Sequence, residues 1–324
     1  MLTINFVGNR RRYGNLMSRK ILVTDTLFVG TEHEAMMNKA GLTVARLPLL
    51  KASESELCDA IADVEGYILG GIERVTAPVI EAAKSLKVIS FTGAGYREFI
   101  PAHELATSKG ISITTARGAN STAVARFAKA LTLGMVRRIP SLTAAGGTDF
   151  YSAKDNEDLT VAVVGFGAVG SKLARELRAD GFKVVVVSDH VEPEIEGFER
   201  VALEDLPQRA DIISVNVSKG RGENVLSKTL IDALPNGAIV VNVAFPSAVD
   251  EKALASRVSA GEIFAAFDAP MEIEHDPFPV GQYVCSNAQA GYNTGRAIKL
   301  TSDMVTRSVI NVLTKGTDQY VANR

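Results

Sequence analysis

Cysteine is scarce in this sequence, which contains only Cys58 and Cys285 among its 324 residues. Two isolated cysteines provide neither a disulfide framework nor the spacing of a metal site, so a reducing, cytoplasmic location is expected. Apolar runs are short, and none reaches the roughly 18 residues that a membrane-spanning helix needs. The formal net charge is only -2, and no basic stripe is present that would attract nucleic acid or an anionic membrane. These absences leave a small molecule as the expected partner.

The composition is that of a globular protein with more than one domain. Hydrophobic residues make up 46% and charged residues 22% of the chain, and there is no low-complexity tract. A single ordinary core rarely serves 324 residues, which favours two domains. Residues 1–17 lack the apolar core and cleavage site of a secretory signal. We expect them to form a loose extension, with Met17 as an alternative start of translation.

Strands and helices alternate from Lys20 onward in the first part of the chain. Short apolar runs predict strands, and helical patterns of about ten residues separate them. Strands joined by such helices lie parallel, so this part is predicted to be a doubly wound α/β domain. The predicted strands are 20–25, 42–48, 66–71, 87–95 and 110–118, and the predicted helices are 31–41, 54–63 and 77–86.

A long helix is predicted over residues 121–139, where Asn120 and Ser121 provide capping residues. It has apolar residues on more than one face, so it either joins two domains or packs in a subunit interface. The second unit begins with a β-α-β pattern, and a final helix is expected to return to the first domain. The sequence thus predicts two doubly wound, Rossmann-like domains, 18–118 with 291–324 and 119–290, with a cleft between them.

The segment GFGAVG, from Gly165 to Gly170, matches the dinucleotide-binding pattern G-x-G-x-x-G. Its context supports the match, because an apolar strand precedes it, a helix follows it, and the next strand ends at an acid. Gly165 permits the tight turn, Gly167 lets the backbone approach a pyrophosphate, and Gly170 allows close packing of helix and strand. The helix N-terminus, with Ala168 and Val169, offers N–H donors and a positive dipole end to the phosphates.

An acidic residue follows the second strand of this unit. Asp189 lies 24 residues after Gly165 (189 − 165) and is expected to accept hydrogen bonds from the ribose hydroxyls. A carboxylate there repels a 2′-phosphate, so NAD is favoured over NADP as the cofactor. Ser188 is an alternative at the ribose position, with Asp189 just beyond it. An acid still faces the 2′-phosphate in that case.

The chain resembles the D-2-hydroxyacid dehydrogenase family, which includes phosphoglycerate dehydrogenase, from about Arg19 to Lys315. The resemblance rests on LKVISFTGAGY, GANSTAVA, GMVRRIP, VVGFGAVG, DIISVNV, GAIVVNVA, AVDEKAL and FAAFDA, in family order. It implies the two-domain fold with a cleft, a homodimer built around the long helix, and contact of Asp268 with the nicotinamide carboxamide. It further implies that the cofactor site includes Asn216, Val217, Ser218, Val243, Ala244 and Gly291.

Members of the family catalyse with an arginine, a glutamate and a histidine, and this sequence departs from the pattern at each. The arginine clamps the substrate carboxylate and polarises the carbonyl, but its position in VNVAFPSAVDE is Phe245. The histidine donates a proton, but its position in NAQAGYN is Gln289. The glutamate is expected five residues beyond Asp268, where Ile273 stands between two acids. A one-residue insertion in this loop brings Glu274 into place.

Other side chains are candidates to replace the missing groups. Gln289 can donate an amide hydrogen to a carbonyl oxygen but cannot act as a general acid near neutral pH. Of the four histidines, only His275 belongs to the loop that could reach the cleft, and an ordinary loop histidine is the alternative. Arg126, which replaces the family's glutamate after V-A, is a candidate for substrate charge, with a surface ion pair as the alternative. Backbone N–H groups for a substrate carboxylate are expected at Gly71, Gly93, Ala94 and Gly95.

Two functions remain open from the sequence. The first is an NAD-dependent oxidoreductase that acts on an unusual hydroxy or keto compound, bulkier or less acidic than the ordinary substrates. The second is a non-catalytic NAD(H)-binding sensor or scaffold that has lost the catalytic residues. We favour the enzyme, because Asp268 and the glycine spacing of Gln289-Ala290-Gly291 are retained. Activity on ordinary 2-keto acids is expected to be poor.

Overall fold

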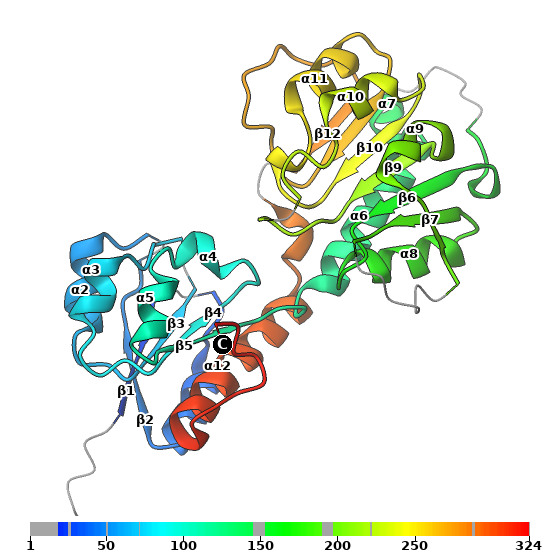
Figure 1. Ribbon diagram of the computed structural model, residues 1–324. Helices are drawn as coiled ribbons and strands as arrows, with labels where there is room; N and C mark the ends of the chain where they lie inside the picture. The colour runs from blue at the N-terminus through cyan, green and yellow to red at the C-terminus, as the bar shows by residue number, and fades with distance from the viewer. Residues whose placement is uncertain are drawn as a thin grey trace, which may run out of the picture. The chain divides into compact units, whose positions relative to one another are not determined.

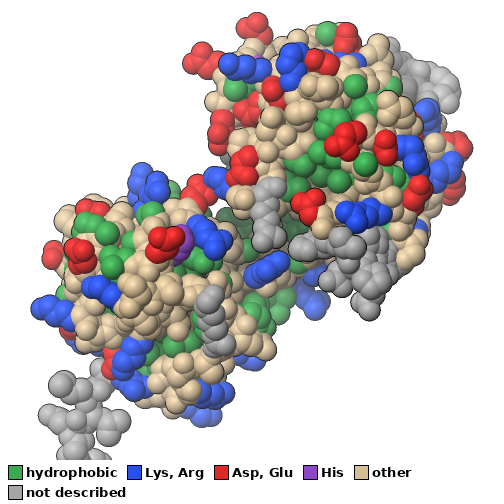
Figure 2. Space-filling model, viewed as in Figure 1, with side chains coloured by type: hydrophobic (Ala, Val, Ile, Leu, Met, Phe, Trp, Pro, Cys, Tyr) green, Lys and Arg blue, Asp and Glu red, His purple; other side chains and the backbone are tan. Residues whose placement is uncertain are grey.

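The computed structural model describes residues 19–24, 27–49, 51–70, 72–144, 153–189, 197–220, 222–286 and 289–323. The chain divides into two compact units (Figure 1). Unit 1 runs to Thr92 and also contains Tyr96–Thr115 and Val305–Arg324, whereas unit 2 consists of Gly93–Gly95 and Ala116–Met304. Acidic and basic side chains are interspersed on the face of each unit that Figure 2 shows, in keeping with the formal net charge of -2.

Unit 1 is built on five parallel strands in the order β2-β1-β3-β4-β5. The strands are β1 (Arg19–Val23), β2 (Leu42–Arg46), β3 (Gly66–Leu69), β4 (Val88–Phe91) and β5 (Ser112–Thr115). The helices are α1 (Thr31–Lys39), α2 (Glu54–Ile61), α3 (Ala77–Ala82), α4 (Tyr96–Phe99) and α5 (His103–Ser108). This strand order is that of flavodoxin-like domains, and the predicted parallel α/β sheet is confirmed. Its core includes Leu22, Leu57, Tyr67, Ile80 and Ile89, all buried.

Two predicted strands of unit 1 end earlier than expected. The predicted strands 87–95 and 110–118 stop at Phe91 and Thr115, because the glycine-bearing segments behind them leave the sheet. Gly118, for example, has a φ of +88°, which a residue with a side chain rarely adopts. The edge beyond β5 is covered by the C-terminal segment, where the N–H of Ala322 donates to the carbonyl of Ile113 at 2.8 Å.

Unit 2 is built on seven parallel strands in the order β12-β11-β10-β9-β6-β7-β8. The strands are β6 (Thr160–Val164), β7 (Lys183–Val187), β8 (Glu199–Arg200), β9 (Ile212–Val215), β10 (Ile239–Asn242), β11 (Phe264–Phe267) and β12 (Tyr283–Cys285). The helices are α8 (Gly170–Ala179), α9 (Leu206–Arg209), α10 (Lys228–Ala233) and α11 (Glu251–Ser259). The first three strands run outward in one direction from β6 and the next four in the other, which is the order of dinucleotide-binding domains. Strand order therefore reverses between β6 and β9, and a ligand crevice is expected at their carboxyl ends.

The long helix predicted over 121–139 is two helices, α6 (Ser121–Val136) and α7 (Ile139–Ala144). Pro140 explains the break, because it has no N–H for the carbonyl of Val136 and its ring collides with that carbonyl in a continuous helix. Arg138 adopts a left-handed conformation at the break, with a φ of +53°. Its guanidinium lies 3.2 Å from the ring centroid of Phe264 in β11, which ties the break to the sheet of unit 2.

The last helix, α12 (Gly295–Lys315), begins in unit 2 and ends in unit 1. Its second half packs on the unit 1 sheet, where Ser90 donates its hydroxyl to the carbonyl of Val305 at 3.2 Å. Gly66 of β3 makes this approach possible, since a Cβ at Gly66 would lie 3.1 Å from Val309 and 2.8 Å from Ile21. None of the helices that the structure describes combines the length and apolar character of a membrane span.

Candidate functional site

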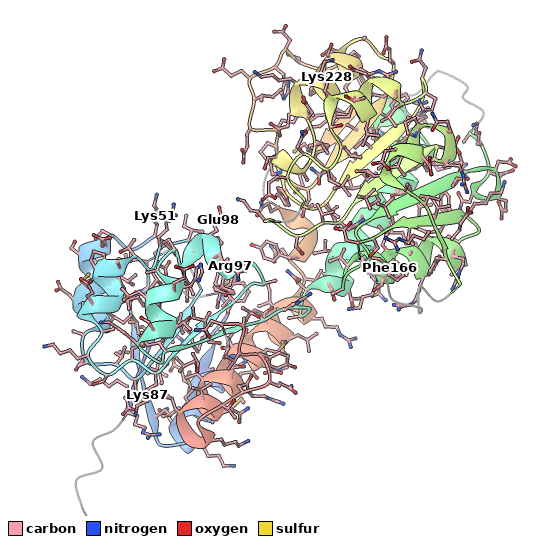
Figure 3. All side chains as sticks on the ribbon, in the orientation of Figure 1. Lys51, Lys87, Arg97, Glu98, Phe166 and Lys228 are labelled. Carbon is pink, nitrogen blue, oxygen red and sulfur yellow. The ribbon has the colours of Figure 1, made fainter. Side chains whose placement is uncertain are left out.

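The glycine-rich turn follows β6 directly and closes tightly on its neighbours. Gly165 has a φ of +90°, and its N–H donates to the carbonyl of Val187 at 2.9 Å. A Cβ at this position would lie 2.9 Å from the carbonyl oxygen of Asn216. Glycine is therefore required twice over, for its backbone conformation and for the close approach of the segment after β9. The turn is held from the side as well, because Phe166 (labelled in Figure 3) packs edge-on against Phe198 at 5.7 Å.

The other two glycines of the motif differ in what surrounds them. A Cβ at Gly170 would overlap the carbonyl of Gly165, so Gly170 lets α8 start against the strand. Gly167 is exposed, and a Cβ there would meet no atom within 4 Å. Ala168 is also exposed, Val169 is half-buried, and the first turn of α8 has no acidic residue. Open space next to free N–H groups and a positive helix end fits a pyrophosphate group.

Ser188 and Asp189 lie at the carboxyl end of β7 with different exposure. Ser188 is buried, at 8% exposure, whereas Asp189 is exposed. Asp189 is therefore the side chain of the two that projects into solvent, where a ribose hydroxyl could reach it. Across the crevice, Asn216, Val217 and Ser218 follow β9, and the N–H of Asn216 donates to the carbonyl of Val164 at 2.8 Å. The predicted residues from β6, β7 and β9 thus share one edge of the sheet.

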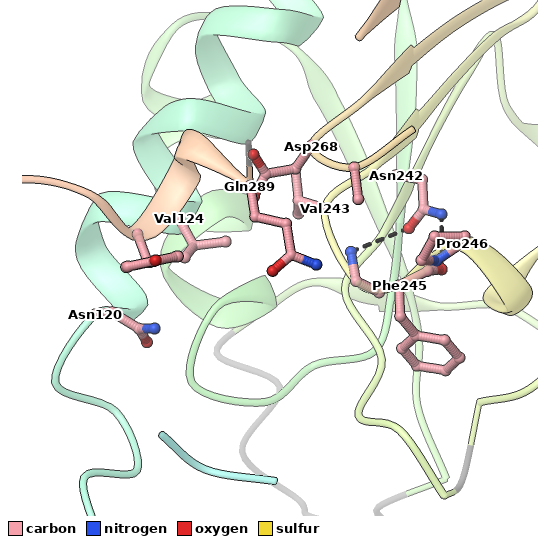
Figure 4. A pocket seen from close by; sticks show the side chains of 11 residues that line it. Asn120, Val124, Asn242, Val243, Phe245, Pro246, Asp268 and Gln289 are labelled. Atoms are coloured by element: carbon pink, nitrogen blue, oxygen red, sulfur yellow. Dashed lines mark hydrogen bonds between the residues drawn. The ribbon is translucent and has the colours of Figure 1, made fainter. Parts of the chain in front are cut away.

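A pocket of about 160 Å³ lies at the carboxyl ends of β10 and β11, next to the start of α6 (Figure 4). Every described residue that lines it belongs to unit 2. Apolar and carboxamide side chains make up most of the wall, and among the described lining residues none is Lys, Arg or His. The lining residues are Asn120, Val124, Asn242, Val243, Ala244, Phe245, Pro246, Asp268, Ala269, Gln289 and Tyr292.

The turn after β10 is fixed by the side chain of Asn242, which is only 3% exposed. Its Oδ1 accepts from the N–H of Ala244 at 3.0 Å, and its Nδ2 donates to the carbonyl of Phe245 at 2.9 Å. The short helix η3 (Pro246–Ala248) then begins with proline at its first turn, where the missing N–H has little effect. In Figure 4 the phenyl ring of Phe245 points away from Gln289. Phe245 is half-buried and packs against the hydrophobic core on that side of the sheet.

Asp268 follows β11 and is the one carboxylate among the described lining residues. Its Oδ1 accepts from the N–H of Gly291 at 2.9 Å, and it is 8% exposed. Burial raises the pKa of Asp268, while the hydrogen bonds from the backbone of Gly291 and Ala290 oppose that shift. Gly291 is needed for this contact, since a Cβ there would lie 2.7 Å from the other carboxylate oxygen. Asp268 therefore anchors the segment that carries Gln289.

Gln289 stands just before the helical turn η4 (Ala290–Tyr292), in a left-handed conformation with a φ of +48°. Its side chain is exposed, and in Figure 4 its amide is directed toward the turn after β10. Opposite it, Asn120 precedes the first turn of α6 and makes no capping hydrogen bond with its side chain. Gln289 and Asn120 consequently present amide groups to the same pocket, and each can donate and accept hydrogen bonds.

Comparison with known proteins connects this geometry to a family. Residues 129–283 match the family described as D-isomer specific 2-hydroxyacid dehydrogenase, NAD binding domain. Over 248 residues the chain is 31% identical to hydroxypyruvate reductase of Thermotoga maritima, which covers 74% of this chain and 79% of that protein. The chain belongs to the D-2-hydroxyacid dehydrogenase family. The suspected resemblance is thus confirmed, and NAD is the cofactor of its second unit.

Two further comparisons show how much of a relative's length this chain covers and which fold it shares. D-3-phosphoglycerate dehydrogenase of Methanocaldococcus jannaschii is 29% identical over 320 residues, which is 94% of this chain but only 59% of that protein. The solved structure of D-2-hydroxyisocaproate dehydrogenase superposes with a TM-score of 0.82 over 94% of this chain and 100% of that chain, at 20% identity. The latter likeness concerns the fold, and the predicted pair of Rossmann-like domains is confirmed.

The predicted replacements for the family's catalytic groups lie outside the described pocket wall. Glu274 and His275 are exposed on the loop after β11, and neither is a lining residue. His275 stacks on Phe278 at 4.3 Å between ring centroids, and its Nδ1 lies 2.9 Å from the carbonyl oxygen of Asp276. This loop is anchored by Glu251 of α11, whose carboxylate accepts from the N–H of Glu272 at 3.0 and 3.1 Å. A catalytic role for Glu274 or His275 stays a prediction.

The described substrate residues suggested by the family resemblance are not among the residues that line the pocket. Arg126 extends from α6 toward α8, with Nε 3.4 Å from Glu176, and its side chain is 71% exposed. That placement favours the surface ion pair given above as the alternative. Gly93, Ala94 and Gly95 follow β4, where the carbonyl of Gly93 accepts from the N–H of Ala116 at 3.0 Å. Gly71 lies outside the described residues, and substrate binding by all these residues stays a prediction.

Sequence reasoning missed several pocket residues, among them Asn120, Asn242 and Tyr292. The signal for Asn242 was present, because an asparagine between a strand and a proline-containing turn often bonds to its own backbone. Asn120 was recognised as a helix cap, and its second possible role at a ligand site was overlooked. No group of three or more His, Cys, Asp and Glu side chains suited to a metal occurs within the described part of the chain.

Proposed function

We propose that this chain is an NAD-dependent oxidoreductase that transfers hydride to or from an unusual hydroxy or keto compound with a non-standard set of catalytic residues. One observation carries the proposal. The described lining of the pocket contains no Lys, Arg or His, and the glycine turn suited to a dinucleotide lies in the same unit. A 2-keto acid would place its carboxylate and its developing alkoxide at a wall where the described residues include the carboxylate of Asp268 and no cation, so neither group would meet a described counter-charge.

Each part of the site has a proposed role in binding the cofactor or the substrate. The turn at Gly165 and the N-terminus of α8 hold the pyrophosphate, and Asp189 bonds to the ribose. Bound NAD(H) supplies or accepts a hydride. Asp268, held in place by Gly291, bonds to the nicotinamide carboxamide. Gln289 donates or accepts a hydrogen bond at the substrate's heteroatom, and Val124 and Val243 exclude water from the apolar wall.

The function is tested by cofactor binding and by turnover measured together. NADH binding is followed by calorimetry, and the purified protein is incubated with NADH and a library of carbonyl compounds, and with NAD and a library of alcohols. Turnover is read from absorbance at the reduced-nicotinamide band. We expect NADH to bind and at least one compound in either library to react. Gly167→Glu is the matched control, because the position is open to solvent and a carboxylate there repels the pyrophosphate without disturbing the core.

A non-catalytic NAD(H)-binding sensor or scaffold is the second candidate function, favoured by the lack of a described proton donor of the family's type. The same experiment separates the two functions. Confirmed NADH binding with no absorbance change in either library would remove an oxidoreductase of hydroxy or keto compounds and favour the sensor. Failure of the wild-type protein to bind NADH would contradict both candidate functions.

We further propose that the protein works in the cytoplasm as a homodimer, on a small-molecule substrate. Two features of α7 support the dimer. None of its residues is buried within the chain, and Ile139 is 51% exposed. Apolar side chains on a helix that its own domain does not cover are typical of a subunit interface.

A further inference from the structure

The described polar side chains that line the pocket of unit 2 include a negative charge and no positive charge. The polar lining side chains are three carboxamides, those of Asn120, Asn242 and Gln289, the phenol of Tyr292 and the carboxylate of Asp268. Asn242 uses both ends of its amide on the turn after β10, so Asn120 and Gln289 keep theirs for a ligand. Asp268 accepts from Gly291 through one oxygen. Among the described lining residues, the formal charge of the wall is therefore negative.

Such a wall opposes hydride addition to a carbonyl group. When hydride adds to the carbon, the C=O π pair moves to oxygen and forms an alkoxide, which needs a proton or a cation at once. Gln289 can donate a hydrogen bond but not a proton near neutral pH. The carboxylate of Asp268 would repel the alkoxide. A carbonyl substrate thus develops negative charge where the wall is already negative.

A protonated imine is stabilised by a negative charge in the same wall, whereas a developing alkoxide needs a positive one. Its nitrogen already carries the proton, so hydride addition forms one C–H bond, moves the C=N π pair to nitrogen and yields a neutral amine. NADH is the reductant and becomes NAD⁺, and no other proton or electron is required. One positive charge is present before the step on the substrate and after it on the nicotinamide. The carboxylate of Asp268 can stabilise that charge throughout.

We propose that this pocket takes protonated imines as substrates and reduces them to amines with NADH. Gln289 suits this substrate, because its amide oxygen accepts a hydrogen bond from the N⁺–H group and its own N–H is not needed as an acid. The inference rests on the proposed NAD-dependent oxidoreductase function, and it replaces the hydroxy or keto compound of that proposal with an imine. Cyclic imines are the simplest probes, since ring closure favours the imine over the open-chain amino carbonyl compound in water.

Binding gives the first test and needs no turnover. The NADH-loaded protein is titrated in a calorimeter with piperidinium and with tetrahydropyran, a ring of the same shape without the charge. A cation about 4 Å from a partly buried carboxylate should bind at least about tenfold more tightly than the neutral ring. Gln289→Arg, at an exposed position, should abolish the preference by adding a positive charge to the wall. Equal affinities in the wild-type protein would overturn the proposal.

Turnover gives the second test. With NADH, 1-piperideine should be reduced and cyclohexanone should react at least about a hundredfold more slowly, the usual effect of one missing oxyanion donor. Deuterated NADH should slow the reaction, whereas D₂O should leave the rate unchanged, because no proton moves in the hydride step. A D₂O effect above twofold, or faster reduction of the ketone, would contradict the inference.

The failure of this inference differs from failure of the proposed function. If carbonyl compounds react and imines do not, the oxidoreductase function holds and the imine substrate is wrong. If NADH binds and neither class reacts, both are wrong. Gln289→His provides an independent check, since it restores a proton donor and a cationic side chain. It should lower the ratio of imine to ketone turnover, and an unchanged ratio would show that Gln289 does not face the reacting group.

Discussion

Replacing Asn242 by alanine tests how the pocket is built, because one buried side chain holds the turn after β10. The variant loses the hydrogen bonds to Ala244 N at 3.0 Å and Phe245 O at 2.9 Å. Each such bond contributes about 0.5–1.5 kcal/mol net, and leaving a buried partner unpaired adds to the loss. With Asn242 only 3% exposed, water cannot readily replace either bond. We expect the free energy of unfolding to fall by about 2–3 kcal/mol.

The assay is urea unfolding followed by circular dichroism, with a shift in midpoint at constant slope taken as lost stability. NADH affinity is measured on the same samples and should fall about tenfold, since the turn carries Val243 and Ala244 at the cofactor site. Asn236→Ala is the matched control, because Asn236 is exposed and its Oδ1 accepts from Arg257 at the surface. It should change stability by less than about 0.5 kcal/mol. An Asn242→Ala protein as stable as this control, with unchanged NADH affinity, would refute the reasoning.

Three other predictions follow from particular residues. NAD(H) should bind at least about tenfold more tightly than NADP(H), a difference in binding free energy of about 1.4 kcal/mol. The Asp189→Ala substitution should reduce this difference. Equal calorimetric affinities in the wild-type protein would show that the acid does not face the ribose. Burial raises the pKa of Glu251 from its ordinary value of 4.5. The protonated side chain therefore contributes its full stabilisation of the fold below pH 4.5. This contribution is lost as the pH rises through the raised pKa of the folded state. Glu251→Gln should lack this decline when urea unfolding is measured from pH 4 to pH 8, and parallel curves for the two proteins would contradict the assignment. Ile139→Glu should convert a dimer to a monomer in light scattering at micromolar concentration, and a wild-type monomer would disprove the proposed assembly.

The fold was largely predictable because its signals are local. The glycine turn, the strand before it and the helix after it occupy consecutive residues, and the steric reasons for Gly165 and Gly170 apply wherever this motif occurs. The break in the helix after Val136 could also have been predicted from the sequence. Pro140 falls four residues later, at the position that a continuous helix cannot accept.

The catalytic side of the pocket was less predictable, because it depends on side-chain direction. We predict Phe245 at the family's arginine position from the sequence, but the sequence does not say that its ring turns toward the hydrophobic core and away from Gln289. His275 likewise stacks on Phe278, a partner three residues away that competes with any role in the pocket. Such choices are decided by packing between segments distant in sequence, which a local pattern does not contain.

The measurement that tests the central claim most directly is the turnover number, kcat, for ordinary family substrates. The claim is that this NAD site lacks the cation and the proton donor that 2-keto acid chemistry needs. Glyoxylate, pyruvate, hydroxypyruvate and 3-phosphoglycerate are assayed with the wild-type protein, and with Phe245→Arg combined with Gln289→His. Each absent charge-stabilising donor typically lowers the rate by about 10² to 10³, so the wild-type protein should turn these compounds over very poorly, and the double variant should gain weak 2-keto acid reduction. Wild-type turnover of any of them at about one per second or faster, a rate within the ordinary range for enzymes, would contradict the account.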